Sequence, residues 1–151
     1  MKFLNAVPPV PLLTILLIDH NRQGLMARKS ILEEQGYAVT TATAWEDGLL
    51  HFSEKLFDLV VTEYKMPRID AAEVIAHVKC QRPNTPVVVI SGMVDALGLT
   101  EQNTGADVVV AKSCNEVSHL TRAVNRLLRA KPARKPVRSQ LATVSAGRKA
   151  L

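Results

Sequence analysis

Residues 57–70 read FDLVVTEYKMPRID, and this stretch decides the class of fold. Residues 59–62 are apolar or β-branched at consecutive positions, which is typical of a short strand buried on both faces. The run ends at the charged residue Glu63, and Pro67 marks residues 64–70 as a loop. The pattern therefore predicts a buried strand whose carboxyl end presents a carboxylate.

The same alternation extends in both directions along the chain. Four further runs of strand length occur at residues 15–18, 38–41, 87–90 and 107–111. Amphipathic stretches separate and follow them, at residues 22–35, 45–55, 71–81, 95–102 and in a final segment that ends before Pro132. Strands that alternate with helices of this length predict an α/β fold, with a parallel sheet covered by helices on both faces.

The final amphipathic segment has the clearest helical pattern. Ser113 and Glu116 have the spacing of a capping box. The expected inward face of this helix consists of Val117, Leu120, Val124, Leu127 and Leu128. The second helix places Trp45, Leu49 and Phe52 on one face in the same way, which predicts that all three belong to the core.

Polar residues stand directly after four of the five predicted strands. They are Asp19, Glu63, Ser91 and Lys112. Function in a doubly wound sheet gathers at the carboxyl ends of the strands, where these side chains meet. We therefore expect a candidate site at that edge. The sequence contains no G-x-G-x-x-G or Walker A loop, so no motif predicts a nucleotide site.

The net charge of +5 on 151 residues lies entirely in the last stretch of the chain. Residues 129–151 carry seven basic side chains and no acidic one, which leaves a net charge of −2 on residues 1–128. A uniformly basic nucleic-acid-binding domain is thereby excluded, and only weak contact through the tail is left open. We expect a Pro-rich lead-in at residues 1–13, a domain at residues 14–131 and a basic, disordered tail at residues 132–151.

The remaining composition indicates a cytoplasmic protein without a membrane partner. No apolar run approaches the roughly 20 residues that cross a bilayer. Cys80 and Cys114 form no disulfide framework and no zinc pattern, as is usual for thiols in a reducing compartment.

These segments together resemble the receiver domain of bacterial two-component response regulators. The resemblance is carried by ILLIDHN (15–21), FDLVVTEYKMPRID (57–70), TPVVVISG (85–92) and TGADVVVAKS (104–113). It implies a flavodoxin-like, five-stranded parallel sheet of order 2-1-3-4-5. It also implies a histidine kinase or another signalling protein as the partner, and a signalling module rather than an enzyme.

The resemblance implies a role for each residue at the strand ends. In the family, an acidic pair after the first strand and an aspartate after the third strand bind Mg²⁺, and that aspartate accepts a phosphoryl group. The acidic pair corresponds to Asp19 and His20 here, and the phosphoacceptor corresponds to Glu63. Ser91 and Lys112 correspond to the residues that contact the phosphoryl oxygens.

Three departures from the family pattern bear on this chemistry. His20 replaces a carboxylate with an imidazole, which is a poor ligand for Mg²⁺. Glu63 is longer than aspartate, which disturbs the in-line geometry of phosphoryl transfer. Val109 stands where the family usually has an aromatic switch residue.

The sequence therefore predicts a stand-alone, receiver-like module that acts by protein–protein interaction, without normal aspartyl phosphorylation and without a required cofactor. Mg²⁺ binding is not favoured, and homodimerisation is left open. Two alternatives remain: a working phosphoacceptor with an altered Mg²⁺ site, and a doubly wound domain that binds a small ligand in the same pocket.

Two side chains have more than one interpretation. Glu63 either mimics a phosphorylated residue by pairing with Lys112 and Ser91, or is a polar strand-end residue satisfied by Lys112. His20 either joins Asp19 and Glu63 in a transition-metal site, or hydrogen-bonds to a neighbouring carboxylate or to water.

Overall fold

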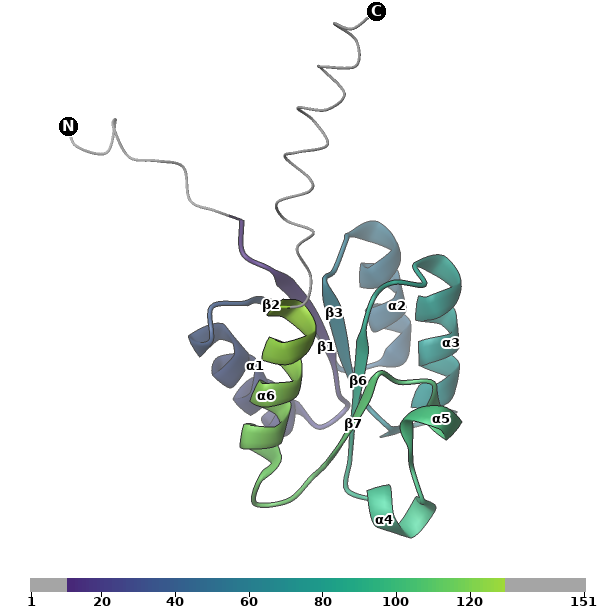
Figure 1. Cartoon of the computed structure of the whole chain (residues 1–151). Helices are drawn as coiled ribbons and strands as arrows, with labels where there is room; N and C mark the ends of the chain where they lie inside the picture. Colours follow the sequence, from purple (N-terminus) through teal and green to yellow (C-terminus); the bar gives the residue numbers. More distant parts are fainter. Residues whose placement is uncertain (1–10, 130–151) are drawn as a thin grey trace, which may run out of the picture.

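A five-stranded parallel sheet forms the centre of the computed structural model, which describes residues 11–129 (Figure 1). Its strands are β1 (Thr14–Ile18), β2 (Ala38–Ala42), β3 (Leu59–Glu63), β6 (Val87–Ser91) and β7 (Val108–Ala111). They lie side by side in the order β2-β1-β3-β6-β7. Numbered among these five strands alone, this is the predicted order 2-1-3-4-5, and the flavodoxin-like fold is confirmed.

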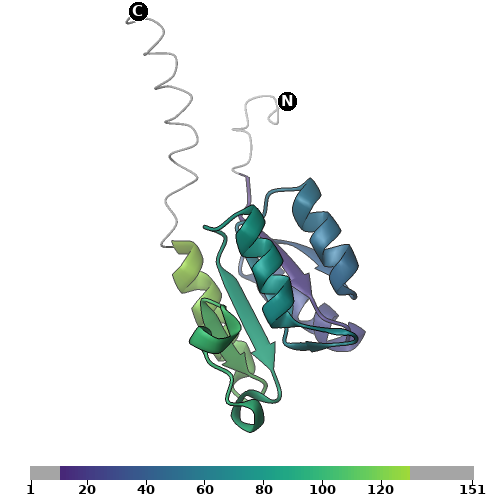
Figure 2. The same cartoon turned by 90° about the vertical axis from the view of Figure 1, so that its right-hand side faces the viewer.

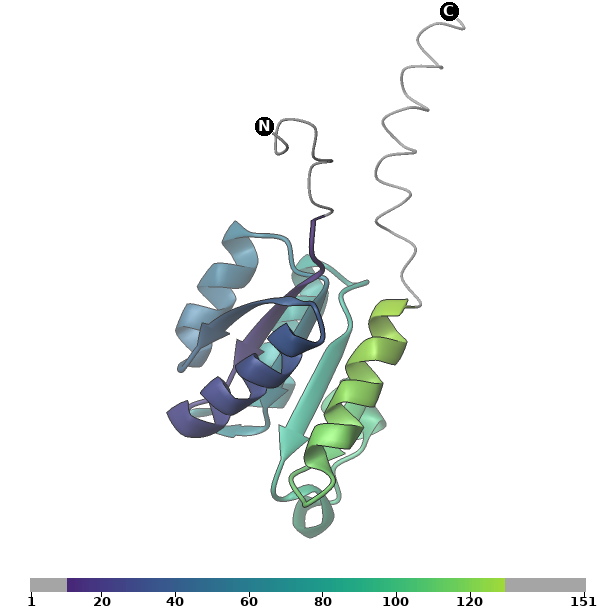
Figure 3. The same cartoon turned by 90° about the vertical axis from the view of Figure 1, so that its left-hand side faces the viewer.

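The helices cover both faces of the sheet. They are α1 (Arg22–Glu34), α2 (Trp45–Glu54), α3 (Ala71–Gln81), α4 (Val94–Leu97), α5 (Glu101–Thr104) and α6 (Glu116–Arg129). Helices α1 and α6 lie next to each other on one face, as Figure 3 shows, and α2 and α3 cover the opposite face (Figure 2). The sheet is thus enclosed between two helical layers.

The apolar runs of the three central strands, β1, β3 and β6, are buried because both faces of the sheet are covered. In β1, Leu16 and Ile18 join the core beneath α2 and α3, whereas Ile15 and Leu17 join the core beneath α1 and α6. All four side chains are at most 1% exposed. The interpretation of consecutive apolar positions as a doubly covered strand is confirmed.

Two expectations for the last helix are wrong in detail. Val117 is 51% exposed, although Leu120, Val124 and Leu128 are buried as predicted. No capping box forms, because the Ser113 hydroxyl accepts a hydrogen bond from the Asn115 N–H and the Glu116 carboxylate turns to Arg28 of α1. An ion pair between helices replaces the local capping contact.

The segment at 64–70, predicted as a loop, forms a small antiparallel hairpin. Its strands are β4 (Lys65–Met66) and β5 (Ile69–Asp70). Arg68 takes the left-handed conformation that closes the turn, with φ of 71°. Met66 and Ile69 pair with each other and are both buried in the core, and this burial fixes the hairpin.

The predicted helix at 95–102 is instead two single turns, α4 and α5. Gly98 ends α4 in the left-handed conformation, with φ of 60°. Thr100 then begins α5 through a capping box with Asn103. A left-handed glycine followed by a strong N-cap stops one helix and starts another.

Two sequence-based expectations concern parts of the chain outside residues 11–129. The expected tail at 132–151 lies wholly there, as does most of the lead-in at 1–13. None of the helices within the described range has the length and apolar character needed to span a membrane.

Gly48 of α2 provides a test of the packing against β1. A Cβ atom at this position would lie 2.5 Å from Cδ1 of the fully buried Ile18. We expect Gly48→Ala to lower the free energy of unfolding by about 1–3 kcal/mol through overpacking, despite the better helix propensity of alanine. Urea denaturation measures this change. The exposed Ser53→Ala in the same helix is the control, expected to stay within about 0.5 kcal/mol; equal stability of both variants would contradict the packing argument.

Candidate functional site

The polar strand-end residues gather at the carboxyl edge of the sheet, as predicted. Backbone hydrogen bonds continue the strand alignment up to this edge. The Tyr64 N–H donates to the Ile90 carbonyl, and the Lys112 N–H donates to the Ser91 carbonyl, each at 2.9 Å. The carboxyl ends of β3, β6 and β7 are therefore held at one level.

Glu63 and Lys112 form a direct ion pair across this edge. The Lys112 ammonium contacts Oε1 of Glu63 as an ion pair. The geometry of this contact is not that of a hydrogen bond. The Glu63 side chain is 5% exposed and the Lys112 side chain 31%. A buried carboxylate thus has a cation as its immediate neighbour, as a charge removed from water requires.

Ser91 lies on the adjacent strand and is fully buried. Its hydroxyl oxygen accepts a hydrogen bond of 2.9 Å from the Met93 N–H, two residues along the chain. Among residues 11–129, the Ser91 hydroxyl has no hydrogen bond to Glu63 or Lys112. The structure brings Glu63 and Lys112 together and leaves Ser91 beside them.

Asp19 is buried, and both of its carboxylate oxygens are already engaged. Oδ1 accepts a hydrogen bond of 2.9 Å from the Asn21 N–H. Oδ2 accepts one of 2.6 Å from Nη1 of Arg28. The imidazole of His20 is about half exposed, and its Nδ1 stays 3.8 Å from Asp19 Oδ1. The predicted pair at 19–20 is therefore split between a buried carboxylate and an exposed ring.

Arg28 is the site residue that the sequence analysis missed. Its guanidinium is buried and bridges Asp19 to Glu116, with Nε 2.6 Å from the Glu116 carboxylate. The helical pattern of the sequence could have predicted that Arg28 is buried. Leu25, Arg28 and Leu32 occupy positions i, i+3 and i+7 on the buried face of α1. A basic residue within an apolar stripe indicates a partner in the interior.

The surroundings of Arg28 strengthen its positive charge. Burial lowers the pKa of the guanidinium, but the hydrogen bonds and charges of Glu116 and Asp19 outweigh burial and raise it above its ordinary value. The two carboxylates thus favour the charged form of Arg28.

A divalent metal does not fit the side chains as they are arranged. Oδ2 of Asp19 faces a guanidinium, Glu63 faces an ammonium, and His20 turns outward. Within residues 11–129, no group of three His, Cys, Asp or Glu side chains is placed to hold a metal ion. Hard cations need free carboxylate oxygens, and the site offers instead two carboxylates already paired with cations.

Val109 is the residue that the resemblance to the receiver family places at the switch position. The side chain packs against the core beneath α2 and α3, and its N–H donates a hydrogen bond of 3.1 Å to the Glu101 carboxylate. The position thus carries a half-buried aliphatic side chain on the edge strand β7.

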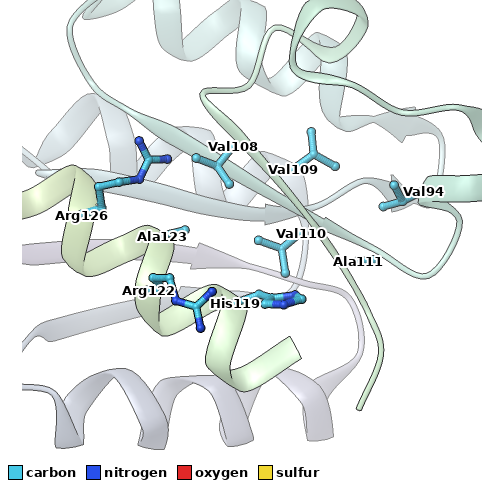
Figure 4. Close-up of a pocket in the computed structure, with 9 residues that line it drawn as sticks. All are labelled: Val94, Val108, Val109, Val110, Ala111, His119, Arg122, Ala123 and Arg126. Carbon is cyan, nitrogen blue, oxygen red and sulfur yellow. The ribbon is translucent and has the colours of Figure 1, made fainter. Parts of the chain in front are cut away.

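A groove of about 380 Å³ lies between α4, β7 and α6 (Figure 4). The groove is lined by Val94, Val108, Val109, Val110, Ala111, His119, Arg122, Ala123 and Arg126. Arg122 and Arg126 are exposed and form no ion pair within residues 11–129. The groove therefore combines an aliphatic floor with an unneutralised cationic rim.

A sheet of this order, with an acidic residue directly after β1, another at the end of β3, a serine at the end of β6 and a lysine after β7, defines the receiver class of signalling domains. The family model for the response regulator receiver domain matches residues 15–125. The chain belongs to this family.

Known relatives and solved structures agree with this assignment. The chain is 27% identical over 112 residues to transcriptional regulatory protein GlrR of Escherichia coli, covering 74% of this chain and 23% of that protein. It is 32% identical over 97 residues to AfsQ1 of Streptomyces coelicolor, covering 64% and 39%. The chain thus spans about a quarter to two fifths of the length of these two relatives.

Two solved structures show the same fold. A receiver domain protein from Clostridium thermocellum matches with a TM-score of 0.71 and 29% identity, over 80% of this chain and 97% of that one. The response regulator TrrA of Thermotoga maritima, solved in complex with Mg²⁺ and BeF, matches with a TM-score of 0.70 and 26% identity, over 77% and 99%.

In the Glu63–Lys112 pair, the carboxylate is buried and the ammonium is partly exposed. Removing one charge or the other should therefore change stability by different amounts. Lys112→Met leaves a buried carboxylate without its cation and should lower the free energy of unfolding by about 1–3 kcal/mol. Glu63→Gln removes the buried charge and should cost less. Urea denaturation at neutral pH measures both, with the exposed Lys65→Met as the control. A larger loss for Glu63→Gln than for Lys112→Met would contradict the assigned roles.

Proposed function

We propose that this chain is a cytoplasmic receiver-type module of a two-component or phosphorelay pathway that acts by binding other proteins, without normal aspartyl phosphorylation. The observation that carries the proposal is the state of the acceptor position: Glu63 is buried, and its carboxylate is paired with Lys112. The free, exposed thiols of Cys80 and Cys114 are compatible with a reducing compartment.

Two geometric points support the loss of phosphoryl transfer. Phosphoryl transfer depends on positioning and charge neutralisation more than on covalent chemistry. The extra methylene of Glu63 moves its carboxylate by about 1.5 Å relative to an aspartate, and a shift of this order can cost about 100-fold in rate. The arrangement of Asp19 and His20 offers Mg²⁺ no pair of free carboxylates.

The contacts also bear on whether Glu63 mimics a phosphorylated residue. Such a mimic would engage both Ser91 and Lys112, whereas the Ser91 hydroxyl oxygen accepts from Met93. Val109 supplies no aromatic ring to report the state of the site. These contacts favour the simpler role, in which Lys112 satisfies a buried strand-end carboxylate.

The groove between α4, β7 and α6 is the surface that we assign to partner binding. Arg122 and Arg126 line it, are exposed and form no ion pair with an acidic side chain of residues 11–129. Residues 1–10 and 130–151 contain no Asp or Glu side chain. The charge and the aliphatic floor fit an acidic, partly apolar segment of a signalling partner.

Phosphorylation is tested with acetyl phosphate and Mg²⁺, followed by mass spectrometry of the intact protein. The natural chain should remain unmodified. Glu63→Asp combined with His20→Asp should gain one phosphoryl group on residue 63, because it restores an acceptor of normal length and a second carboxylate. Glu63→Gln combined with His20→Asp is the matched control and should stay unmodified.

Two outcomes would change this assignment. A stable phosphoryl group on Glu63 of the natural chain would show that the altered site still works as an acceptor. Failure of the restored variant would indicate that the pocket has changed beyond these two positions.

The groove is tested by charge reversal. Arg122→Glu combined with Arg126→Glu should abolish the capture of a signalling partner from a cell extract, because it turns the rim acidic. Arg22→Glu combined with Lys55→Glu changes the net charge equally at exposed positions outside the groove, and should retain the partner. Equal loss in both variants would indicate general electrostatic attraction instead of groove docking.

A further inference from the structure

The strongest unassigned feature is the buried guanidinium of Arg28. Arg28 stands on the face of α1 that otherwise buries Leu25 and Leu32, and the residue is only 7% exposed. One edge of the guanidinium contacts Asp19 and another contacts Glu116, each at 2.6 Å. Two carboxylates from different elements therefore share one cation.

Each carboxylate oxygen of Asp19 already accepts a hydrogen bond in this arrangement. The Asn21 N–H holds Oδ1 through a turn that leads into α1, and Arg28 holds Oδ2. A divalent cation approaching Oδ2 would have to displace a hydrogen bond to a charged donor and would face the positive charge of the guanidinium. The environment of Asp19 therefore disfavours divalent cations for two separate reasons.

Gly24 leaves the space through which the Arg28 side chain reaches Asp19. A Cβ atom on Gly24 would lie 2.9 Å from Nη1 of Arg28 and 3.6 Å from Oδ1 of Asn21. Glycine is a poor helix former, so its presence in the first turn of α1 needs a local reason. The close approach of the guanidinium supplies that reason, and Asn21 caps the helix by accepting from the Gly24 N–H.

We propose that Arg28 is an internal cation that takes the place of the divalent ion at Asp19 and connects this pocket to the start of α6 through Glu116. The proposal goes beyond the proposed function, because it concerns Asp19 and α1 and does not depend on whether Glu63 accepts a phosphoryl group. Arg28 acts as a positioning residue: it fixes the Asp19 carboxylate and supplies the compensating charge.

The test is a titration with Mn²⁺, followed by paramagnetic broadening of backbone amide signals in the ¹⁵N-labelled full chain. In the natural protein, millimolar Mn²⁺ should leave the signals of Asp19, His20 and Glu63 no more broadened than the rest of the surface. Selective broadening at these three residues would overturn the proposal directly, and this measurement requires no substitution.

The second arm compares variants that all carry His20→Asp and Glu63→Asp, which supply carboxylates for a cation. Adding Arg28→Gln should tighten Mn²⁺ binding at Asp19 by at least about tenfold, the usual scale for groups that adjust metal ligands. Lys29→Gln removes an equal charge from the same helix, at a side chain paired with Glu33, and should leave the affinity unchanged. Equal affinities with and without Arg28 would refute the proposal.

Gly24→Ala provides a variant in which Arg28 is retained. The added methyl group displaces the far end of a flexible side chain, so the fold should persist while the guanidinium moves away from Asp19. In the same background, this variant should also tighten Mn²⁺ binding, by less than Arg28→Gln.

If Arg28→Gln fails to fold, the Gly24→Ala variant decides the test: an unchanged Mn²⁺ affinity would count against the proposal. Phosphorylation of these variants is scored separately, so that the two proposals can fail independently.

Discussion

The parallel alignment of β1, β3, β6 and β7 is the constraint on which the rest of the site depends. Parallel strands all end at the same edge, and helices on both faces keep that edge in register. Residues from four distant parts of the sequence therefore meet without any long loop to carry them. The polar residues at the ends of β1, β3 and β6 stand out because the apolar runs before them are buried.

Two buried carboxylates at this edge are each matched by a cation from the same chain. Asp19 pairs with Arg28, and Glu63 pairs with Lys112. Buried charges are stable only when paired, and this pocket contains its own counter-charges. The charges of the pocket are therefore balanced within the chain. The two ion pairs connect the end of β1 to α1, and the end of β3 to the residue that follows β7.

Much of this arrangement follows from local sequence patterns. The five strands and the polar residues at their ends could be predicted, because consecutive apolar residues and strand-end polar residues are local signals. The strand order, and the roles that bring Glu63 and Lys112 to one site, came from the resemblance to the receiver family. The hairpin at 64–70 and the break at Gly98 were missed, because one depends on the burial of Met66 and Ile69 and the other on a backbone conformation.

The Arg28 bridge was the largest omission, and the reason is its long range. Its partner Glu116 lies 88 residues away, and the spacing of Ser113 and Glu116 indicated a local capping box instead. A capping carboxylate gains one hydrogen bond from an uncharged backbone N–H, whereas the bridge to a buried guanidinium joins two opposite charges. Tertiary electrostatics therefore decided the conformation of a side chain that the local pattern assigned differently.

The contact between Glu101 and the Val109 N–H has a consequence for how the sheet ends. β7 is an edge strand, and the free amide of such a strand invites an extended chain to add by backbone hydrogen bonding. Here a carboxylate from α5 already accepts from that amide and places a negative charge beside it. The Val109 amide is therefore not free to pair with an added strand, and an extended chain that approached β7 there would meet the negative charge of Glu101.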